Sequence, residues 1–144
     1  MIKFTDQPID PDVLRCELFD PTAGAYVGFE GWIRNENEGY SVERLEYEVY
    51  EPLAISEGEK VITEAVERFA ILHAHCVHRT GMLEIGECAV WVGVSSEHRD
   101  DGFNGAVGGA SFYNGNILIS NAVISGNNAI QMVGGIYFSN SNVE

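Results

Sequence analysis

The segment that most constrains the fold covers residues 87–95, which alternate as a β-strand does. Residues of a strand point in turn to opposite faces of a sheet. Here both faces are apolar: Val90, Val92 and Val94 occupy one, and Ala89, Trp91 and Gly93 occupy the other. A strand with two apolar faces is typical of the centre of a sheet that is covered on both sides.

Polar residues follow this strand at once, in the order Ser95, Ser96, Glu97, His98 and Arg99. A rigid strand that ends in hydroxyl, imidazole and guanidinium groups is a common way to build an active site. The end of this strand is therefore the first candidate site.

The rest of residues 1–103 supplies partners for the central strand. Asp10, Pro11 and Asp12 form a helix start, with an acidic N-cap before proline, and this short helix ends near Asp20. Strands are predicted at residues 25–34, 42–50 and 74–79, the second with one wet face. Ser56 and Glu59 fit a capping box, which predicts a long amphipathic helix from residue 56 to residue 72. The fold class is α+β.

The composition changes near residue 104, where Gly, Asn and Ser dominate. A repeat is visible: GGASFYNGNI begins at Gly108 and GGIYFSNSNV begins at Gly134. Short β-branched runs between Asn and Gly are typical of the rungs of a parallel β-helix. We therefore predict two domains, residues 1–103 and a β-helix-like C-terminal segment at residues 104–144.

Charge and composition exclude several classes of partner. The 144-residue chain has a formal net charge of −14, which disfavours nucleic acid and anionic membranes. No apolar run reaches membrane-spanning length and the N-terminus lacks the apolar segment of a signal peptide, so we expect a soluble cytoplasmic protein. The odd number of cysteines argues against a disulfide framework, and Cys16, Cys76 and Cys88 are expected to be small buried hydrophobes.

Histidines 73, 75 and 78 form an H-x-H-x-x-H pattern, and a strand would place His73 and His75 on one face. No acid or cysteine of matching spacing accompanies them, so the pattern is only a weak indication of a metal site. No metal or cofactor is predicted.

Three ordered motifs carry a family resemblance. They are Gly31-x-x-Arg34-Asn35-x-Asn37, then His78-Arg79-x-Gly81-x-Leu83-x-Ile85-Gly86-Glu87, then Val92-Gly93-Val94-x-x-x-His98-Arg99. Over roughly residues 14–103 the chain resembles the large, catalytic subunit of molybdopterin synthase, an enzyme of molybdenum cofactor biosynthesis.

The resemblance implies an α/β hammerhead fold and a homodimer within a heterotetramer. It also implies a small ubiquitin-like sulfur-carrier subunit, whose C-terminal thiocarboxylate gives sulfur to cyclic pyranopterin monophosphate to make molybdopterin. By residue match, Arg34, His98 and Arg99 would bind this anionic substrate, and His98 is the candidate catalytic residue. Read without the family, both arginines are more simply surface residues that pair with nearby glutamates.

The chain departs from the family after the His98-Arg99 pair, where the resemblance implies a helix with two lysines. The only lysines here are Lys3 and Lys60, and the sequence after Phe103 shows no helical pattern. Turnover is therefore expected to be low. Two alternatives stay open: a non-catalytic binding or assembly module that retains the dimer and partner surface, and a structural chain dominated by the β-helix segment.

Overall fold

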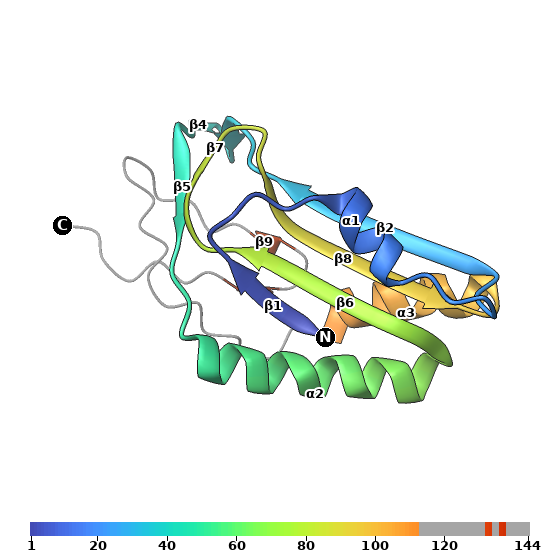
Figure 1. The fold of residues 1–144 in the computed structure, drawn as a ribbon. Coiled ribbons are helices and arrows are strands. Elements are labelled where there is room, and N and C mark those ends of the chain that lie inside the picture. Colours follow the sequence, from blue (N-terminus) through green and yellow to red (C-terminus); the bar gives the residue numbers. More distant parts are fainter. Residues whose placement is uncertain (113–131, 134–135, 138–144) are drawn as a thin grey trace.

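The computed structural model describes residues 1–112, 132–133 and 136–137. Its main sheet has four strands in the order β1 (Ile2–Thr5), β6 (Ile71–Arg79), β8 (Cys88–Ser96) and β2 (Ala25–Trp32) (Figure 1). In the described part of the chain three helices accompany it: α1 (Pro11–Glu17), α2 (Glu51–Phe69) and α3 (Arg99–Phe112). The shorter strands are β3 (Glu36–Asn37), β4 (Tyr40–Ser41), β5 (Arg44–Tyr47), β7 (Gly81–Glu84), β9 (Met132–Val133) and β10 (Ile136–Tyr137).

Strand β8 lies at the centre of the sheet, as its two apolar faces predict. It pairs antiparallel with β6 on one side and with β2 on the other. The closest neighbours of Gly93 are side-chain atoms of Trp91 and Leu18, which places the α1 end on one face of the sheet. Gly102 of α3 lies against Val27 and Ser96, so α3 covers the opposite face together with α2. Trp91 and Val94 are 1% and 2% exposed, which confirms that both faces of β8 are buried.

Helix α1 begins as predicted. The Asp10 carboxylate accepts hydrogen bonds from the backbone N–H groups of Asp12 and Val13, and a proline follows the cap. The helix itself buries none of its residues, and the apolar anchor is Leu18, which is 1% exposed.

Helix α2 begins earlier than the capping box predicted. Its N-cap is Tyr50, with a proline in the first turn, so Ser56 lies inside the helix. Glu59 instead accepts a hydrogen bond from the backbone N–H of Ile2 at 2.8 Å. The predicted cap is wrong because the helix already runs from Glu51, and the Glu59 side chain satisfies a donor of β1, a strand that was not predicted. Gly58 of the same helix lies against Ile2.

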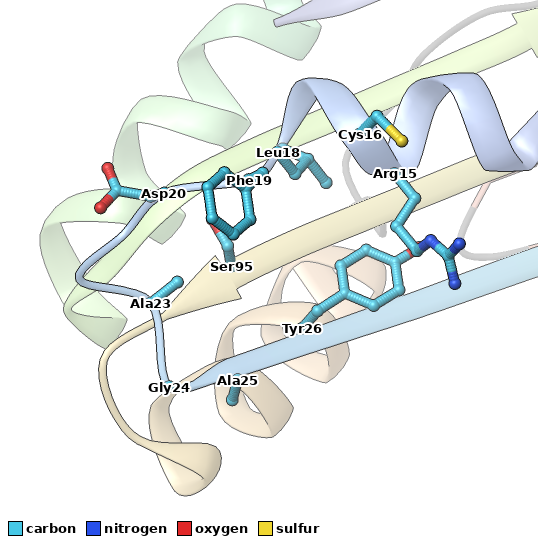
Figure 2. A pocket seen from close by; sticks show the side chains of 10 residues that line it. All are labelled: Arg15, Cys16, Leu18, Phe19, Asp20, Ala23, Gly24, Ala25, Tyr26 and Ser95. Carbon is cyan, nitrogen blue, oxygen red and sulfur yellow. The ribbon is translucent and has the colours of Figure 1, made fainter.

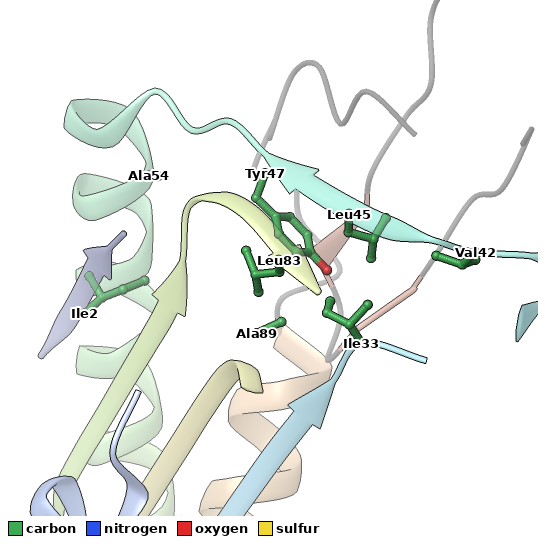
Figure 3. Packing of buried hydrophobic residues seen from close by; sticks show 8 residues of the cluster. All are labelled: Ile2, Ile33, Val42, Leu45, Tyr47, Ala54, Leu83 and Ala89. Carbon is green, nitrogen blue, oxygen red and sulfur yellow. The ribbon is translucent and has the colours of Figure 1, made fainter. Parts of the chain in front are cut away.

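A hydrophobic cluster joins α2 and β1 to the paired strands β5 and β7 (Figure 3). Its buried members are Ile2, Ile33, Val42, Leu45, Tyr47, Ala54, Leu83 and Ala89. The predicted strand at residues 42–50 is only four residues long here, and the buried residues Leu45 and Tyr47 alternate along it as predicted. Strand β7 is followed by a turn at residues 85–86, which leads into β8.

Helix α3 contradicts the prediction that no helix follows Phe103. It starts at Arg99, with Asp100 and Asp101 in its first turn, where acidic side chains interact favourably with the helix dipole. It also passes through residue 103, where the first domain was expected to end. Glycines lower helix propensity, which hid this helix in the sequence, but here they allow close packing on the sheet. Gly105 lies against Ile71 and Phe69.

The Gly108 and Gly134 repeats lie largely outside the described residues, so the β-helix-like segment and the division at residue 103 stay predictions. In the described part of that segment, β9 and β10 pair antiparallel. Within the described residues, no helix combines the length and apolar character needed to cross a membrane.

The cysteines are all free thiols, and their environments differ. Burial raises the pKa of Cys76 to about 12 and that of Cys88 to about 11, so both thiols stay protonated near neutral pH. Cys16 is exposed, so the expectation that it is buried is wrong.

Candidate functional site

The end of β8 fixes the turn that carries His98 and Arg99. The Ser96 hydroxyl donates to the carbonyl oxygen of His98 at 2.6 Å, and the backbone N–H of Gly102 donates to the same oxygen at 3.2 Å. These bonds tie the turn to both the strand and the first turn of α3. The side chains of His98 and Arg99 are exposed, so they are available to a ligand.

Arg34 lies at the opposite end of the sheet. Strand β2 runs antiparallel to β8, so Ala25 faces Ser96 while Trp32 faces Cys88. Ala25 and Trp32 are seven residues apart along β2. At about 3.3 Å per residue, the two ends of the paired strands are therefore roughly 23 Å apart. One chain therefore brings His98 and Arg99 together but leaves Arg34 at the far end of the strand.

The exposed Arg34 is held by the short turn that follows β2. Its guanidinium donates to the side-chain oxygen of Asn37, which is 4% exposed. The side-chain nitrogen of Asn37 is buried and has no hydrogen-bond partner among the described residues. Both residues belong to the first family motif, so the asparagine positions the arginine rather than facing solvent.

A pocket of about 590 Å³ opens near the His98 end, on the face of the sheet that carries α1 (Figure 2). Its lining residues come from the end of α1, the loop after it, the start of β2 and the end of β8. They are Arg15, Cys16, Leu18, Phe19, Asp20, Ala23, Gly24, Ala25, Tyr26 and Ser95.

The pocket wall combines aromatic surface with a few polar groups. Ser95 is 2% exposed, and its hydroxyl has no hydrogen-bond partner among the described residues. Partial burial raises the pKa of Tyr26, which keeps the phenol protonated and able to donate a hydrogen bond. Hydrogen bonds from Thr22 and then from His73 lower the pKa of Asp20, so its carboxylate is charged. Ser95 was noted as a hydroxyl at the strand end, whereas Tyr26 was not predicted to take part, because only the antiparallel pairing of β2 with β8 sets Tyr26 opposite Ser95.

The three histidines of the H-x-H-x-x-H pattern have separate partners. His73 lies 3.2 Å from Asp20, and His75 lies 3.8 Å from Glu17. His78 is buried, and its Nδ1 lies 2.7 Å from the carbonyl oxygen of Arg79. In the described part of the chain, no group of His, Cys, Asp or Glu side chains is arranged to hold a metal ion.

The comparison with protein families matches residues 4–107 to the family described as MoaE protein. This chain belongs to the MoaE family. The matched residues include Arg34, His98, Arg99 and most of α3, so the family extends beyond the predicted domain end at residue 103.

Molybdopterin synthase catalytic subunit 1 of Mycobacterium tuberculosis is 36% identical over 72% of this chain and 71% of its own length. Other molybdopterin synthase catalytic subunits are matched over between 52% and 74% of their own length.

Solved structures confirm the α+β fold class. Molybdopterin synthase from Staphylococcus aureus has a TM-score of 0.73 at 30% identity, and the match covers 78% of this chain and 82% of that one. A chain of the complex of subunits 1 and 2 of molybdopterin-converting factor from Helicobacter pylori has a TM-score of 0.61 over 72% of this chain and 70% of its own. At 20% identity, this second similarity supports the MoaE fold alone.

Proposed function

We propose that this chain is the catalytic subunit of a molybdopterin synthase. In this reaction, sulfur moves from the thiocarboxylate of a small carrier subunit to cyclic pyranopterin monophosphate, in the cytoplasm. The observation that carries the proposal is the His98-Arg99 pair, fixed by Ser96 at the end of the central strand of a MoaE-family chain.

The chemistry of the pair suits a phosphate-bearing substrate. A planar guanidinium donates two parallel hydrogen bonds to a phosphate, and an imidazole can donate or accept a proton near neutral pH. The chain carries a net charge of −14, so an anion is attracted only where cations are locally concentrated. His98 and Arg99 supply one such place, and Arg34 supplies another at the far end of β2.

Two copies of the chain would be needed to combine these cations in one site, because a single sheet keeps them roughly 23 Å apart. We propose a site formed by Arg34 of one copy and by His98 and Arg99 of another. The homodimer implied by the family resemblance supplies the second copy.

Mixing two inactive variants tests this arrangement. Arg34→Ala and Arg99→Ala homodimers each lack one group in every site. A mixed dimer contains one site with both arginines intact and one site with neither. We expect each variant alone to bind substrate weakly. Random exchange makes about half of the dimers mixed and each mixed dimer has one intact site of two, so the mixture should recover about a quarter of the parent protein's sites by calorimetry. If dimers that are shown to be mixed recover no substrate binding, each site is built from one chain.

A carrier subunit is the proposed protein partner. The Helicobacter pylori structure, which has the same fold, is described as a complex of subunits 1 and 2 of its own factor. Pull-down of a thiocarboxylated carrier by this chain tests the partner independently of turnover.

A non-catalytic binding module is the second candidate. The observation that favours it is that no lysine follows Lys60 in the sequence. A module of this kind would bind the carrier and the pterin substrate but would form no dithiolene, and this outcome separates it from the enzyme.

A further inference from the structure

Arg34 lies just beyond the paired part of the main sheet. The pairing of β2 with β8 shifts register between Gly31 and Trp32, and its last pair is Trp32 with Cys88. The position of Arg34, the isolated cation of the candidate site, is therefore not fixed by the main sheet itself. Contacts outside the sheet must hold the backbone that carries this arginine.

The turn between β7 and β8 supplies these contacts. Ile33 donates its backbone N–H to the carbonyl oxygen of Glu87 at 3.0 Å, and Gly86 donates its backbone N–H to the carbonyl oxygen of Ile33 at 2.7 Å. The Ile33 side chain is 3% exposed and belongs to the same cluster as Leu83 (Figure 3). Both backbone groups of the residue before Arg34 thus depend on this turn.

The side chain of Glu87 closes the turn. Its Oε2 accepts the backbone N–H of Glu84 at 2.7 Å, and the backbone N–H of Glu87 donates to the carbonyl oxygen of Glu84 at 3.2 Å. Gly86 lies between them with a φ of 87°, in the left-handed region that favours glycine. The Glu87 carboxylate therefore stabilises the turn that brings Gly86 and Glu87 to Ile33.

Arg79, at the end of β6, holds the Glu87 carboxylate. Its Nη1 lies 3.4 Å from Oε1 of Glu87, and its side chain is 6% exposed, whereas that of Glu87 is 35% exposed. The hydrogen bond from the Glu84 backbone and then the Arg79 guanidinium lower the pKa of Glu87, so its carboxylate is charged near neutral pH. The ion pair thus fixes the Glu87 side chain, and Glu87 fixes the turn.

The chain is anchored on the other side of Arg34 as well. The carbonyl oxygen of Asn35 accepts the backbone N–H of Val42 at 2.9 Å, and the Arg34 guanidinium donates to the buried Asn37. Because the backbone is held both before and after Arg34, a displacement of Ile33 moves the guanidinium instead of being absorbed by a loose loop.

We propose that Arg79 and Glu87 are positioning residues for Arg34. Their ion pair shapes the β7–β8 turn, the turn holds Ile33, and Ile33 sets where the Arg34 guanidinium meets an anionic substrate. Both residues belong to the second ordered motif of the sequence, which the candidate site otherwise leaves without a role. The consequence for substrate binding rests on the proposed function, whereas the placement of Arg34 does not.

Substrate binding tests this series of contacts. We expect Glu87→Ala to weaken the binding of cyclic pyranopterin monophosphate at least about fivefold in calorimetry, because a displaced guanidinium loses most of a charge-assisted contact. In an Arg34→Ala background the same change should have no further effect, because Glu87 acts through Arg34. The control is Glu84→Ala, which removes an exposed side chain of the same turn, keeps the backbone N–H and should bind like the parent.

A second variant separates positioning from folding. Glu87→Ala leaves the buried Arg79 without its charged partner and should lower the melting temperature. The double variant Arg79→Met, Glu87→Ala removes the buried charge as well and should restore most of that stability. We expect its affinity for the pterin phosphate to stay low, because the turn has lost the carboxylate that closes it. Recovery of affinity together with stability would show that the pair serves the fold alone and would overturn the proposal.

Arginine side-chain NMR tests the placement of Arg34 without substrate. The Arg34 Nε–H signal is assigned by its loss in Arg34→Ala. We expect Glu87→Ala to move this signal toward that of an unrestrained arginine, while Glu84→Ala leaves it unchanged.

Two results would overturn the proposal: an unchanged Arg34 signal in Glu87→Ala, or an equal loss of affinity from Glu87→Ala with and without Arg34. Parent-like affinity in Glu87→Ala, where Arg34→Ala weakens binding, would overturn it too. Parent-like affinity in Arg34→Ala would instead refute the role of Arg34 in the proposed function, and the NMR signal would still decide whether Glu87 positions Arg34.

Discussion

At the scale of single residues, His78 makes stability depend on pH. It is 2% exposed, and the ring of Tyr47 packs edge-on against it at 4.9 Å. Burial lowers its pKa to about 4. The unfolded chain binds this proton near pH 6.5, so the stabilisation from a neutral His78 is complete above pH 6.5 and is lost as the pH falls toward 4.

Urea unfolding at pH 7 and at pH 5 tests this contribution. We expect the parent chain to lose about 2 kcal/mol of unfolding free energy between these two values through His78. The His78→Gln variant, which has no titrating group there, should lose less over the same interval. Equal losses in the two proteins would show that His78 does not set this dependence.

Arg99 is the residue on which substrate binding is expected to depend most directly. A charge-assisted hydrogen bond contributes about 1.5–3 kcal/mol. Arg99→Ala should therefore weaken the binding of cyclic pyranopterin monophosphate about tenfold or more in calorimetry. Lys60→Ala removes an exposed cation of α2 that pairs with Glu57, and it should leave the affinity unchanged. Parent-like affinity in Arg99→Ala would remove Arg99 from the site.

At the scale of elements, the end of α2 is strained. Its C-cap, Ala70, has a φ of 49°, in the left-handed region that favours glycine. Ala70→Gly should raise the unfolding free energy by about 0.5–1 kcal/mol, because it relieves this strain. Glu67→Gly, at an exposed position inside the helix, should lower it by a similar amount. Thermal unfolding of both variants shows whether stability rises in Ala70→Gly and falls in Glu67→Gly. Destabilisation by Ala70→Gly would show that the backbone at Ala70 is not strained.

At the scale of the whole molecule, the chain should turn over slowly even where it binds substrate. A positioned acid or base typically contributes about 10²–10⁴-fold in rate. The family resemblance implies lysines for this role after the His98-Arg99 pair, and α3 stands at that place with none among its residues. Because those lysines are missing, we expect dithiolene formation at least about 10²-fold slower than in a lysine-containing relative.

Reconstitution with a thiocarboxylated carrier and the pterin precursor measures that rate. A variant in which a lysine-bearing helix replaces the chain after Phe103 should recover turnover. A parent rate equal to that of the relative would contradict the prediction.

Local features of the fold could be predicted from short stretches of the sequence. Alternation identified β8 as the central strand, because both faces of Val90–Val94 are apolar. The Asp10 cap identified α1, because the signal lies within three consecutive residues. The ordered motifs identified the family over most of the described chain, and they selected Arg34, His98 and Arg99 as candidate site residues.

Features that depend on contacts between distant segments could not be predicted in this way. Helix α3 forms from a glycine-rich segment because its glycines pack on β8, β2 and the end of α2, which a propensity argument cannot include. Glu59 lies inside α2 rather than at its cap, and its carboxylate accepts a hydrogen bond from β1, which comes from the other end of the sequence. Arg34 and Arg99 lie at opposite ends of one sheet because β2 and β8 are antiparallel, and strand direction is set by pairing between segments about sixty residues apart rather than by either segment alone.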